Sequence, residues 1–241
     1  MDCMVAMKEF PDKFFDLAVV DPPYGDATED GKDSTKLRFH GGDRWDRYSK
    51  SALVERTGGT WASKYGKVIN EWDIAPKPEY FDELFRISKN QIIWGGNYFN
   101  LPPTRCFLIW KKLTISESFT MAMAEYAWTS FNGNAKVFEC APQGNKEKRF
   151  HPTQKPIELY DWVFKNYAQS GFKILDTHLG SGSSRIAAWK AGLDFYGYEV
   201  DKTYFDLQEE RFKKHSSQVN LFVDQEQTNM FDFGGDTTLL L

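Results

Sequence analysis

Short apolar runs alternate along this chain with longer stretches in which apolar residues recur at helical spacing. The run Leu17–Val20 fits a buried strand. The stretch Pro78–Ser88 fits a helix that has proline in its first turn and one apolar face. The same reasoning predicts strands over 173–176 and 195–199, and helices over 156–168, 185–189 and 202–214. This alternation predicts an α/β fold, and 241 residues suit one such domain.

The segment Asp21-Pro22-Pro23-Tyr24-Gly25 directly follows the first predicted strand. Two consecutive prolines end sheet pairing, so they fix a carboxylate, two carbonyls and a ring at the carboxyl end of that strand. Open α/β sheets bind their ligands at these ends. Asp21 and the Pro22 carbonyl can accept the two hydrogens of an exocyclic amine, and Tyr24 can stack on a planar base. A strand followed by a polyproline turn would explain the same residues without any function.

A glycine-containing turn, Leu179–Ser184, lies between the strand over 173–176 and the next helix. Its small residues allow a ligand to approach the backbone, and the start of the helix offers free amide donors. Glu199, at the end of the strand over 195–199, is spaced to bind the hydroxyls of a ribose. A dinucleotide is the first candidate, but the full Gly-x-Gly-x-x-Gly spacing is missing. S-adenosylmethionine fits better, because its methionine end needs room and amide donors rather than a phosphate cradle.

In this order, the two motifs resemble those of the DNA amino-methyltransferases of adenine N6 and cytosine N4, in the permuted β-class arrangement. In that class the catalytic Asp/Asn/Ser-Pro-Pro-Tyr/Phe motif precedes the cofactor turn, as it does here. The resemblance covers most of the chain and implies a Rossmann-like methyltransferase sheet with helices on both faces, with the catalytic half before the cofactor half. Further segments similar to family motifs lie at 1–12, 92–99, 106–111, 125–130 and 151–156.

The resemblance also implies roles for individual residues. It makes Asp21, Pro22, Pro23 and Tyr24 catalytic. It places Asp2 against the adenine of the cofactor, and Thr153 and Lys155 against its methionine carboxylate. The family's Asp-Pro-Phe is here Asp176-Thr177-His178, which leaves the role of His178 open. The complete set of residues expected to bind the cofactor is Asp2, Cys3, Asp21, Thr153, Lys155, Asp176, His178, Gly180, Ser181, Gly182, Ser183, Glu199 and Val200.

The three cysteines bear on the choice of reaction. Methylation at cytosine C5 needs a thiolate nucleophile, usually after proline, and neither Cys3, Cys106 nor Cys140 follows proline. Their spacing fits no metal site, so we expect reduced cysteines and no metal. An exocyclic amine can instead attack the sulfonium methyl group directly, aided by hydrogen bonds to Asp21 and the Pro22 carbonyl. Adenine is favoured over cytosine by the resemblance, because Asp in the first motif position usually accompanies adenine.

The net charge of −4 is unusual for a protein that binds DNA, but the charge is unevenly distributed. Residues 104–155 carry eight lysines and arginines against four glutamates, whereas 194–241 carry ten acids against four bases. Phosphates are therefore expected to meet the catalytic half. The alternative is that these lysines form an ordinary solvated face. The residues expected to contact DNA are Arg38, Arg44, Arg47, Lys146, Lys148 and Arg149.

The chain divides into segments with different expected tasks. Residues 1–131 form the catalytic half, and within it the polar, glycine-rich insertion 26–72, with a helix over 47–56, is expected to contact DNA. Residues 132–149 form a short target-recognition segment, and 150–214 form the cofactor-binding half. Residues 215–241 are expected to be a loose acidic tail.

The sequence thus predicts a methyltransferase that acts on N6 of a flipped adenine in duplex DNA. Cytosine N4 methylation, an RNA or protein amide substrate, and a catalytically idle DNA-binding or interaction protein are the alternatives. No leader and no apolar run of membrane-spanning length is found, so a cytoplasmic location without a membrane partner is expected. Gln218–Phe222 resembles the Gln-x-x-Leu-Phe peptides that dock on the sliding clamp, with an edge strand over 219–223 as the alternative. A homodimer is compatible with the sequence.

Overall fold

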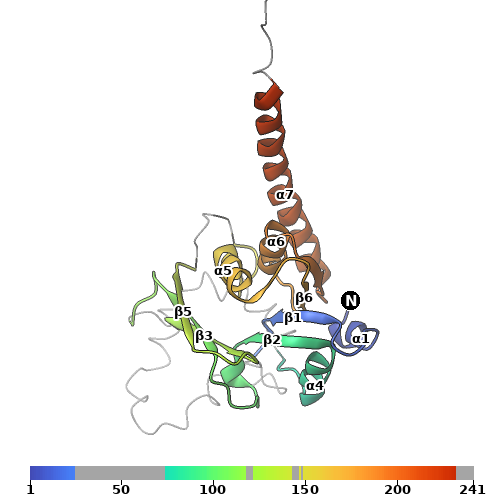
Figure 1. Cartoon of the computed structure of the whole chain (residues 1–241). Helices are drawn as coiled ribbons and strands as arrows, with labels where there is room; N and C mark the ends of the chain where they lie inside the picture. The colour runs from blue at the N-terminus through green and yellow to red at the C-terminus, as the bar shows by residue number, and fades with distance from the viewer. Residues whose placement is uncertain (25–73, 118–121, 143–146, 148, 232–241) are drawn as a thin grey trace, which may run out of the picture.

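The computed structural model describes residues 1–24, 74–117, 122–142, 147 and 149–231. Seven strands form one sheet in the order β5-β3-β4-β2-β1-β6-β7 (Figure 1). β4 runs antiparallel to its neighbours β2 and β3, and the other neighbouring pairs are parallel. The strands are β1 (Phe15–Val20), β2 (Ser88–Trp94), β3 (Phe107–Lys112), β4 (Ala124–Thr129), β5 (Lys136–Cys140), β6 (Lys173–Asp176) and β7 (Asp194–Gly197).

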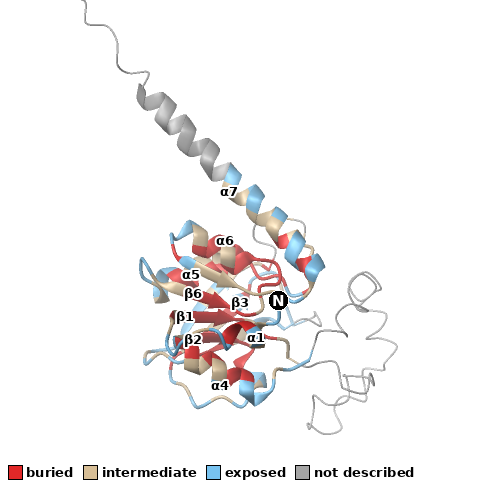
Figure 2. Ribbon diagram, turned by 90° about the vertical axis from the view of Figure 1, so that its right-hand side faces the viewer, coloured by how far each residue is buried: buried red, intermediate tan, exposed pale blue. Residues whose placement is uncertain are grey.

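Helices cover both faces of the sheet, as expected for an α/β methyltransferase fold (Figure 2). One face is covered by α1 and α4, and the other by α5 and α6. The helices are α1 (Cys3–Met7), α4 (Pro78–Ile87), the short 3-10 helix η2 (Gly96–Tyr98), α5 (Ile157–Tyr167), α6 (Ser183–Lys190) and α7 (Lys202–Phe231).

The apolar run of β1 explains why this strand lies inside the sheet. Its side chains alternate between the two faces: Leu17 and Val19 belong to the core beneath α5 and α6, and Ala18 and Val20 to the core beside α1 and α4. All four are essentially inaccessible to solvent. A strand buried on both faces carries a continuous apolar run, which is the pattern that the sequence shows.

The neighbouring positions of β1 and β6 within the sheet create a candidate ligand site. These two parallel strands are neighbours, with Leu17 paired with Ile174. The chain continues from β1 to β2 on one side and from β6 to β7 on the other. Their carboxyl ends therefore diverge at a topological switch point, where open α/β sheets bind ligands. Asp21 follows β1 and Asp176 ends β6, so both lie at this point.

The predicted strands and helices in the described part of the chain are confirmed, and except at the end of the last helix their boundaries differ by a few residues. The strand predicted over 195–199 ends at Gly197. β5 was not predicted. It lies within the expected target-recognition segment 132–149 and pairs with β3 alone, and its alternate residues are exposed, with Val137 at 60%. An edge strand of this kind carries little of the apolar signal that identifies a central strand.

The predicted end of the last helix is wrong. We expected a helix over 202–214 followed by a loose tail from 215, but α7 continues to Phe231. The extension has a physical reason, because residues 215–231 contain neither proline nor glycine and nothing in them stops a helix. An edge strand over 219–223 is excluded by the same observation. None of the helices in the described ranges is long and apolar enough to cross a membrane.

Candidate active site

Asp21 is the centre of the candidate site. One carboxylate oxygen, Oδ1, accepts a hydrogen bond of 2.9 Å from the Tyr24 hydroxyl. The other, Oδ2, forms an ion pair with Lys155 Nζ. The Asp21 side chain is 14% exposed and that of Lys155 is 4% exposed, so the pair is largely removed from water. Burial raises the pKa of Asp21 above its usual value, and the ammonium of Lys155 opposes that rise.

Two further charges extend this pair into a network. Lys155 Nζ lies 3.2 Å from Glu125 Oε2, and Lys112 Nζ lies 2.6 Å from Glu125 Oε1. Burial acts to raise the pKa of Glu125, but the two ammonium groups outweigh it and lower that pKa. Lys112, Glu125, Lys155 and Asp21 carry two positive and two negative charges in total, so the network is neutral when all four are ionised.

Gly95, directly after β2, lies against the ring of Tyr24. The Tyr24 ring stacks on that of Tyr98, with ring centroids 4.6 Å apart and planes inclined by 22°. Gly95 has φ of +67°, and a Cβ atom there would lie 2.0 Å from the Tyr24 ring. A side chain at position 95 and the observed position of Tyr24 are therefore incompatible. The Gly95-Gly96 pair after a strand was the sequence signal that could have identified this contact.

Replacing Gly95 with alanine should disturb Tyr24 more than it disturbs the fold. The added methyl would overlap the ring, and the backbone at positive φ disfavours any side chain. We expect loss of methyl transfer by roughly tenfold or more, since a misplaced aromatic costs near-attack geometry. The variant's turnover, together with its melting temperature, checks this.

Gly171→Ala serves as the control for the Gly95 variant. Gly171 also has a positive φ, of +81°, but a Cβ there would meet nothing within 4 Å. This variant should retain wild-type turnover. If Gly95→Ala also turned over normally, Tyr24 would not need its observed position.

The glycine turn after β6 is held by two carboxylates. Glu199 Oε2 accepts a hydrogen bond of 2.8 Å from the Gly180 amide, and Oε1 accepts one of 2.9 Å from the Asp201 amide. Asp176 accepts bonds from the Ser184 hydroxyl at 2.5 Å and the His178 amide at 3.1 Å. Burial raises the pKa of Asp176 to about 7. The predicted cofactor residues Asp176, Gly180 and Glu199 are thus brought together.

α7 packs over this turn through residues that sequence reasoning did not identify. Arg211 Nη1 donates to the Ser181 carbonyl and to the Ser183 hydroxyl, both at 2.8 Å. Gly182 has φ of +71°, and a Cβ there would meet the fully buried Gln208 at 3.0 Å. The Ser183 hydroxyl in turn donates to the Lys155 carbonyl at 2.7 Å. The turn is therefore connected both to α7 and to the segment that carries Lys155.

The remaining predicted cofactor residues surround the same end of the sheet. Asp2 caps α1, accepting a bond of 2.8 Å from the Met4 amide, and its charge acts on His178. Burial lowers the pKa of His178 to about 4 and raises that of the Cys3 thiol to about 11. Thr153 is exposed, with its hydroxyl 3.2 Å from His151 Nδ1, and Val200 is 70% exposed. Cys3, Cys106 and Cys140 are free thiols.

The structure corrects the charge count behind the expected DNA-binding face. Lys112 and Lys155, two of the eight basic residues counted in 104–155, are buried in ion pairs and unavailable to phosphates. Arg149 donates to the carbonyls of Pro152 and Gln154, at 3.2 and 3.1 Å, so it also shapes its own loop. The other predicted DNA-binding residues lie outside the described part of the chain: Arg38, Arg44, Arg47, Lys146 and Lys148.

The comparisons with known proteins agree with this geometry. The family model of the N6/N4 DNA methylases matches residues 70–210. The type II methyltransferase M2.MboI of Moraxella bovis is 24% identical over 88% of this chain and 85% of its own length. Two solved structures share the fold. The M1.HpyAVI–SAM complex has a TM-score of 0.51 and 16% identity over 88% of this chain and 96% of its own. The cytosine-N4-specific PvuII DNA methyltransferase has a TM-score of 0.52 and 12% identity over 91% and 89%.

The matched segment extends from before α4 to within α7, and so includes β2 to β7, Glu125, Lys155 and the glycine turn. It covers more than half of the chain, and the Asp-Pro-Pro-Tyr motif lies N-terminal to it, directly after β1, which pairs with β6. The chain belongs to the N6/N4 DNA methylase family.

Proposed function

We propose that this DNA amino-methyltransferase transfers the methyl group of S-adenosylmethionine to N6 of an adenine flipped out of duplex DNA. The observation that carries the proposal is the placement of Asp21 and Tyr24 beside the glycine turn, at the switch point between β1 and β6. The same fold in a complex with this cofactor supports the choice of methyl donor. The choice of adenine rests on Asp at the first position of the Asp-Pro-Pro-Tyr motif, which in this family usually accompanies adenine.

The residues present fit a nucleoside cofactor. Each oxygen of Glu199 accepts one amide hydrogen, which leaves a second lone pair on each for the ribose hydroxyls. Exposed Val200 follows directly and offers an apolar surface to the adenine ring. Lys155 Nζ donates one of its three hydrogens to Asp21 and pairs with Glu125 Oε2 at 3.2 Å without a hydrogen bond, so a hydrogen is left for the methionine carboxylate. Thr153 lies two residues away and is exposed.

The chemistry asked of the protein is to orient an amine. The cofactor supplies an activated methyl on sulfonium sulfur. The nitrogen lone pair forms the new N–C bond while the C–S bond breaks, and the methylated amine then releases one proton. Asp21 and the Pro22 carbonyl accept the amine hydrogens, which favours a tetrahedral, nucleophilic nitrogen. In the structure, the Tyr24 hydroxyl donates a hydrogen bond to Asp21 Oδ1. The incoming amine replaces this bond, while the Tyr24 ring stacks on the base.

The product identifies the reaction. Purified protein, labelled cofactor and unmodified plasmid DNA are incubated, the DNA is digested to nucleosides, and the modified nucleoside is identified by mass. N6-methyl-2′-deoxyadenosine supports the proposal. N4-methyl-2′-deoxycytidine would instead support the cytosine alternative, which is favoured by the fold shared with the cytosine-N4-specific PvuII enzyme. Absence of both would favour a catalytically idle DNA-binding protein.

Contacts with DNA are proposed for the insertion 26–72 and the segment 132–149. If Lys146 and Lys148 touch phosphates, neutralising both should weaken binding to all DNA sequences alike and reduce the slope of log affinity against log salt by roughly 0.9 for each lost contact. Arg149 is left intact, because it bonds its own loop. Binding titrations at several salt concentrations measure the slope, and Lys165→Gln on α5 serves as the control. An unchanged slope in the double variant would remove these lysines from the interface.

Docking of Gln218–Phe222 on a sliding clamp remains a proposal, and it requires a change of conformation in this segment. The segment lies within α7, so an extended bound peptide would first have to leave the helix. Binding of purified clamp to a peptide spanning 216–233 tests it.

A further inference from the structure

A chain of alternating charges leads from β3, the neighbour of the edge strand β5, to the proposed catalytic carboxylate. It begins at Lys112 on β3, passes through Glu125 on β4 to Lys155 just before α5, and ends at Asp21 after β1. Lys112 and Lys155 are 7% and 5% exposed, and Glu125 lies between them. Buried charges are costly unless paired, so these four segments contribute their charges at some expense in stability.

We propose that Glu125 is a positioning residue for methyl transfer, which shares the Lys155 ammonium with Asp21 and so keeps Asp21 a strong acceptor for the target amine. The inference rests on the proposed function, in which Asp21 accepts hydrogens of the amine. Lys112 acts on the far side of Glu125 and limits how strongly Glu125 attracts Lys155.

The pKa of Asp21 depends on the charges of Lys155 and Glu125. Lys155 favours the ionised form of Asp21, and the like charge of Glu125 opposes it. Without Glu125, the ammonium would bind Asp21 alone, with the unpaired Lys112 charge nearby. Both changes weaken Asp21 as an acceptor, because a carboxylate that holds a strong ion pair has a lower proton affinity. Glu125 therefore adjusts Asp21 without touching the substrate.

Other titratable groups face the network and remain the same in every variant considered. Burial raises the pKa values of Tyr24, Tyr80 and Tyr160, so these three side chains stay neutral in the pH range of the assay. Burial raises the pKa of Asp176 to about 7 and the charge of Asp21 adds to that rise, so Asp176 is kept unchanged in every variant. These groups are Tyr24, Tyr80, Tyr160 and Asp176.

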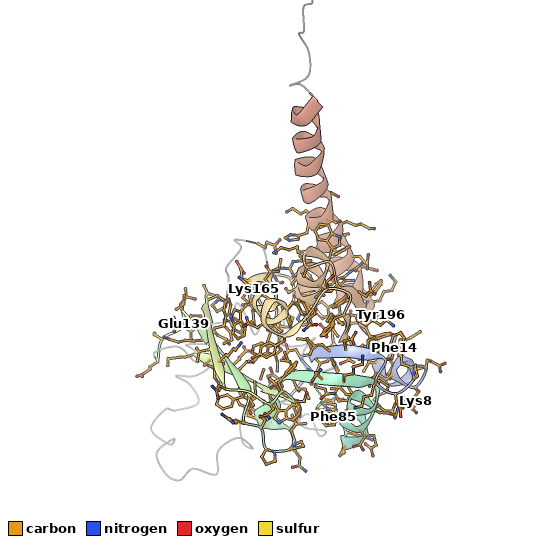
Figure 3. The ribbon with its side chains drawn as sticks, viewed as in Figure 1. Lys8, Phe14, Phe85, Glu139, Lys165 and Tyr196 are labelled. Atoms are coloured by element: carbon orange, nitrogen blue, oxygen red, sulfur yellow. The ribbon has the colours of Figure 1, made fainter. Side chains whose placement is uncertain are left out.

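The chain provides a matched control on the neighbouring position of β3. Lys111 pairs with Glu139 of β5 at 2.8 Å, but both side chains are at least half exposed. Glu139 lies at the β5 edge of the sheet (Figure 3). The two ion pairs thus share the strand β3 and differ in burial and in their connection to Asp21. Removing Glu139 should leave the acid limb of the kcat–pH profile at the pH found for the wild type.

The test measures kcat against pH at saturating S-adenosylmethionine and saturating unmodified plasmid DNA. Glu125→Gln should lower the plateau kcat by roughly tenfold, since acceptor strength falls with proton affinity. It should also move the acid limb of the profile to lower pH by roughly one unit. Lys112→Gln should move the limb in the opposite direction, to higher pH, because a positive charge near Asp21 is lost. Glu125→Asp keeps the negative charge, so its acid limb should lie close to the wild-type pH.

If Glu125→Gln and Lys112→Gln displace the acid limb in opposite directions, the inference is supported. A loss of folding would displace the limb of both variants in the same direction. If the limb stays at the wild-type pH in both folded variants, the inference is overturned. It is also overturned if Glu125→Gln raises only the KM for S-adenosylmethionine, since Lys155 would then serve the cofactor alone. Failure of the proposed function looks different: Asp21→Ala would then retain turnover.

Discussion

Asp21→Ala should reduce methyl transfer by roughly a hundredfold or more while S-adenosylmethionine binding persists. The expected size is that of removing one preorganised group that serves the transition state. The fold should tolerate the change, because Lys155 keeps Glu125 as a partner when Asp21 is removed. Turnover with labelled cofactor and calorimetric titration of the cofactor measure the two effects separately.

Two further variants sharpen the Asp21 experiment. Asp21→Asn keeps the shape but loses the charge, so its residual activity reports how much of the effect is electrostatic. Asp12→Ala removes an exposed carboxylate that pairs with Arg86 on α4, and should leave turnover unchanged. Turnover of the Asp21→Ala variant within a few-fold of wild type would reject the catalytic assignment.

The central part of the fold could be predicted because its signals are local. β1 and β6 are apolar runs buried on both faces, and α4 and α5 show one apolar face after a proline. The placement of the proline motif and the glycine turn at the neighbouring carboxyl ends of β1 and β6 could also be predicted, since each directly follows a predicted strand. β5 and the true end of α7 were missed, because an exposed edge strand and a polar helix without a stop signal have weak patterns.

The partners of Asp21 could not be predicted from local pattern. Lys155 is 134 positions away in sequence, and Glu125 and Lys112 are charged residues of strands that would ordinarily be assigned to a solvated edge. Only the antiparallel insertion of β4 between β2 and β3 brings Glu125 under Lys155. For the same reason the count of positive charges in 104–155 overstated the surface available to DNA, because two of those charges point into the core.

Lys155→Met should be among the most destabilising single changes in this domain. It leaves Asp21 and Glu125 without their shared cation in a region that is largely closed to water. Breaking a buried pair by removing one partner costs about 3–5 kcal/mol. For a domain of this size, each kcal/mol lowers the melting temperature by about 2–4 °C. Thermal unfolding of the variant and the wild type at neutral pH measures the difference.

The destabilisation should depend on pH with a definite sign. Without Lys155, the pKa of the buried Asp21 carboxyl is expected to rise further above its unfolded value, because the ammonium no longer opposes burial. A group whose folded pKa is raised binds more protons in the folded state, so the variant's stability falls as pH rises. The difference in melting temperature between the variant and the wild type should therefore be smaller in mild acid than at neutral pH. Lys111→Met, which breaks the exposed pair with Glu139, should show neither the loss of stability nor its pH dependence. If the difference in stability between Lys155→Met and the wild type did not change with pH, this would contradict an ionised Asp21 in the native site.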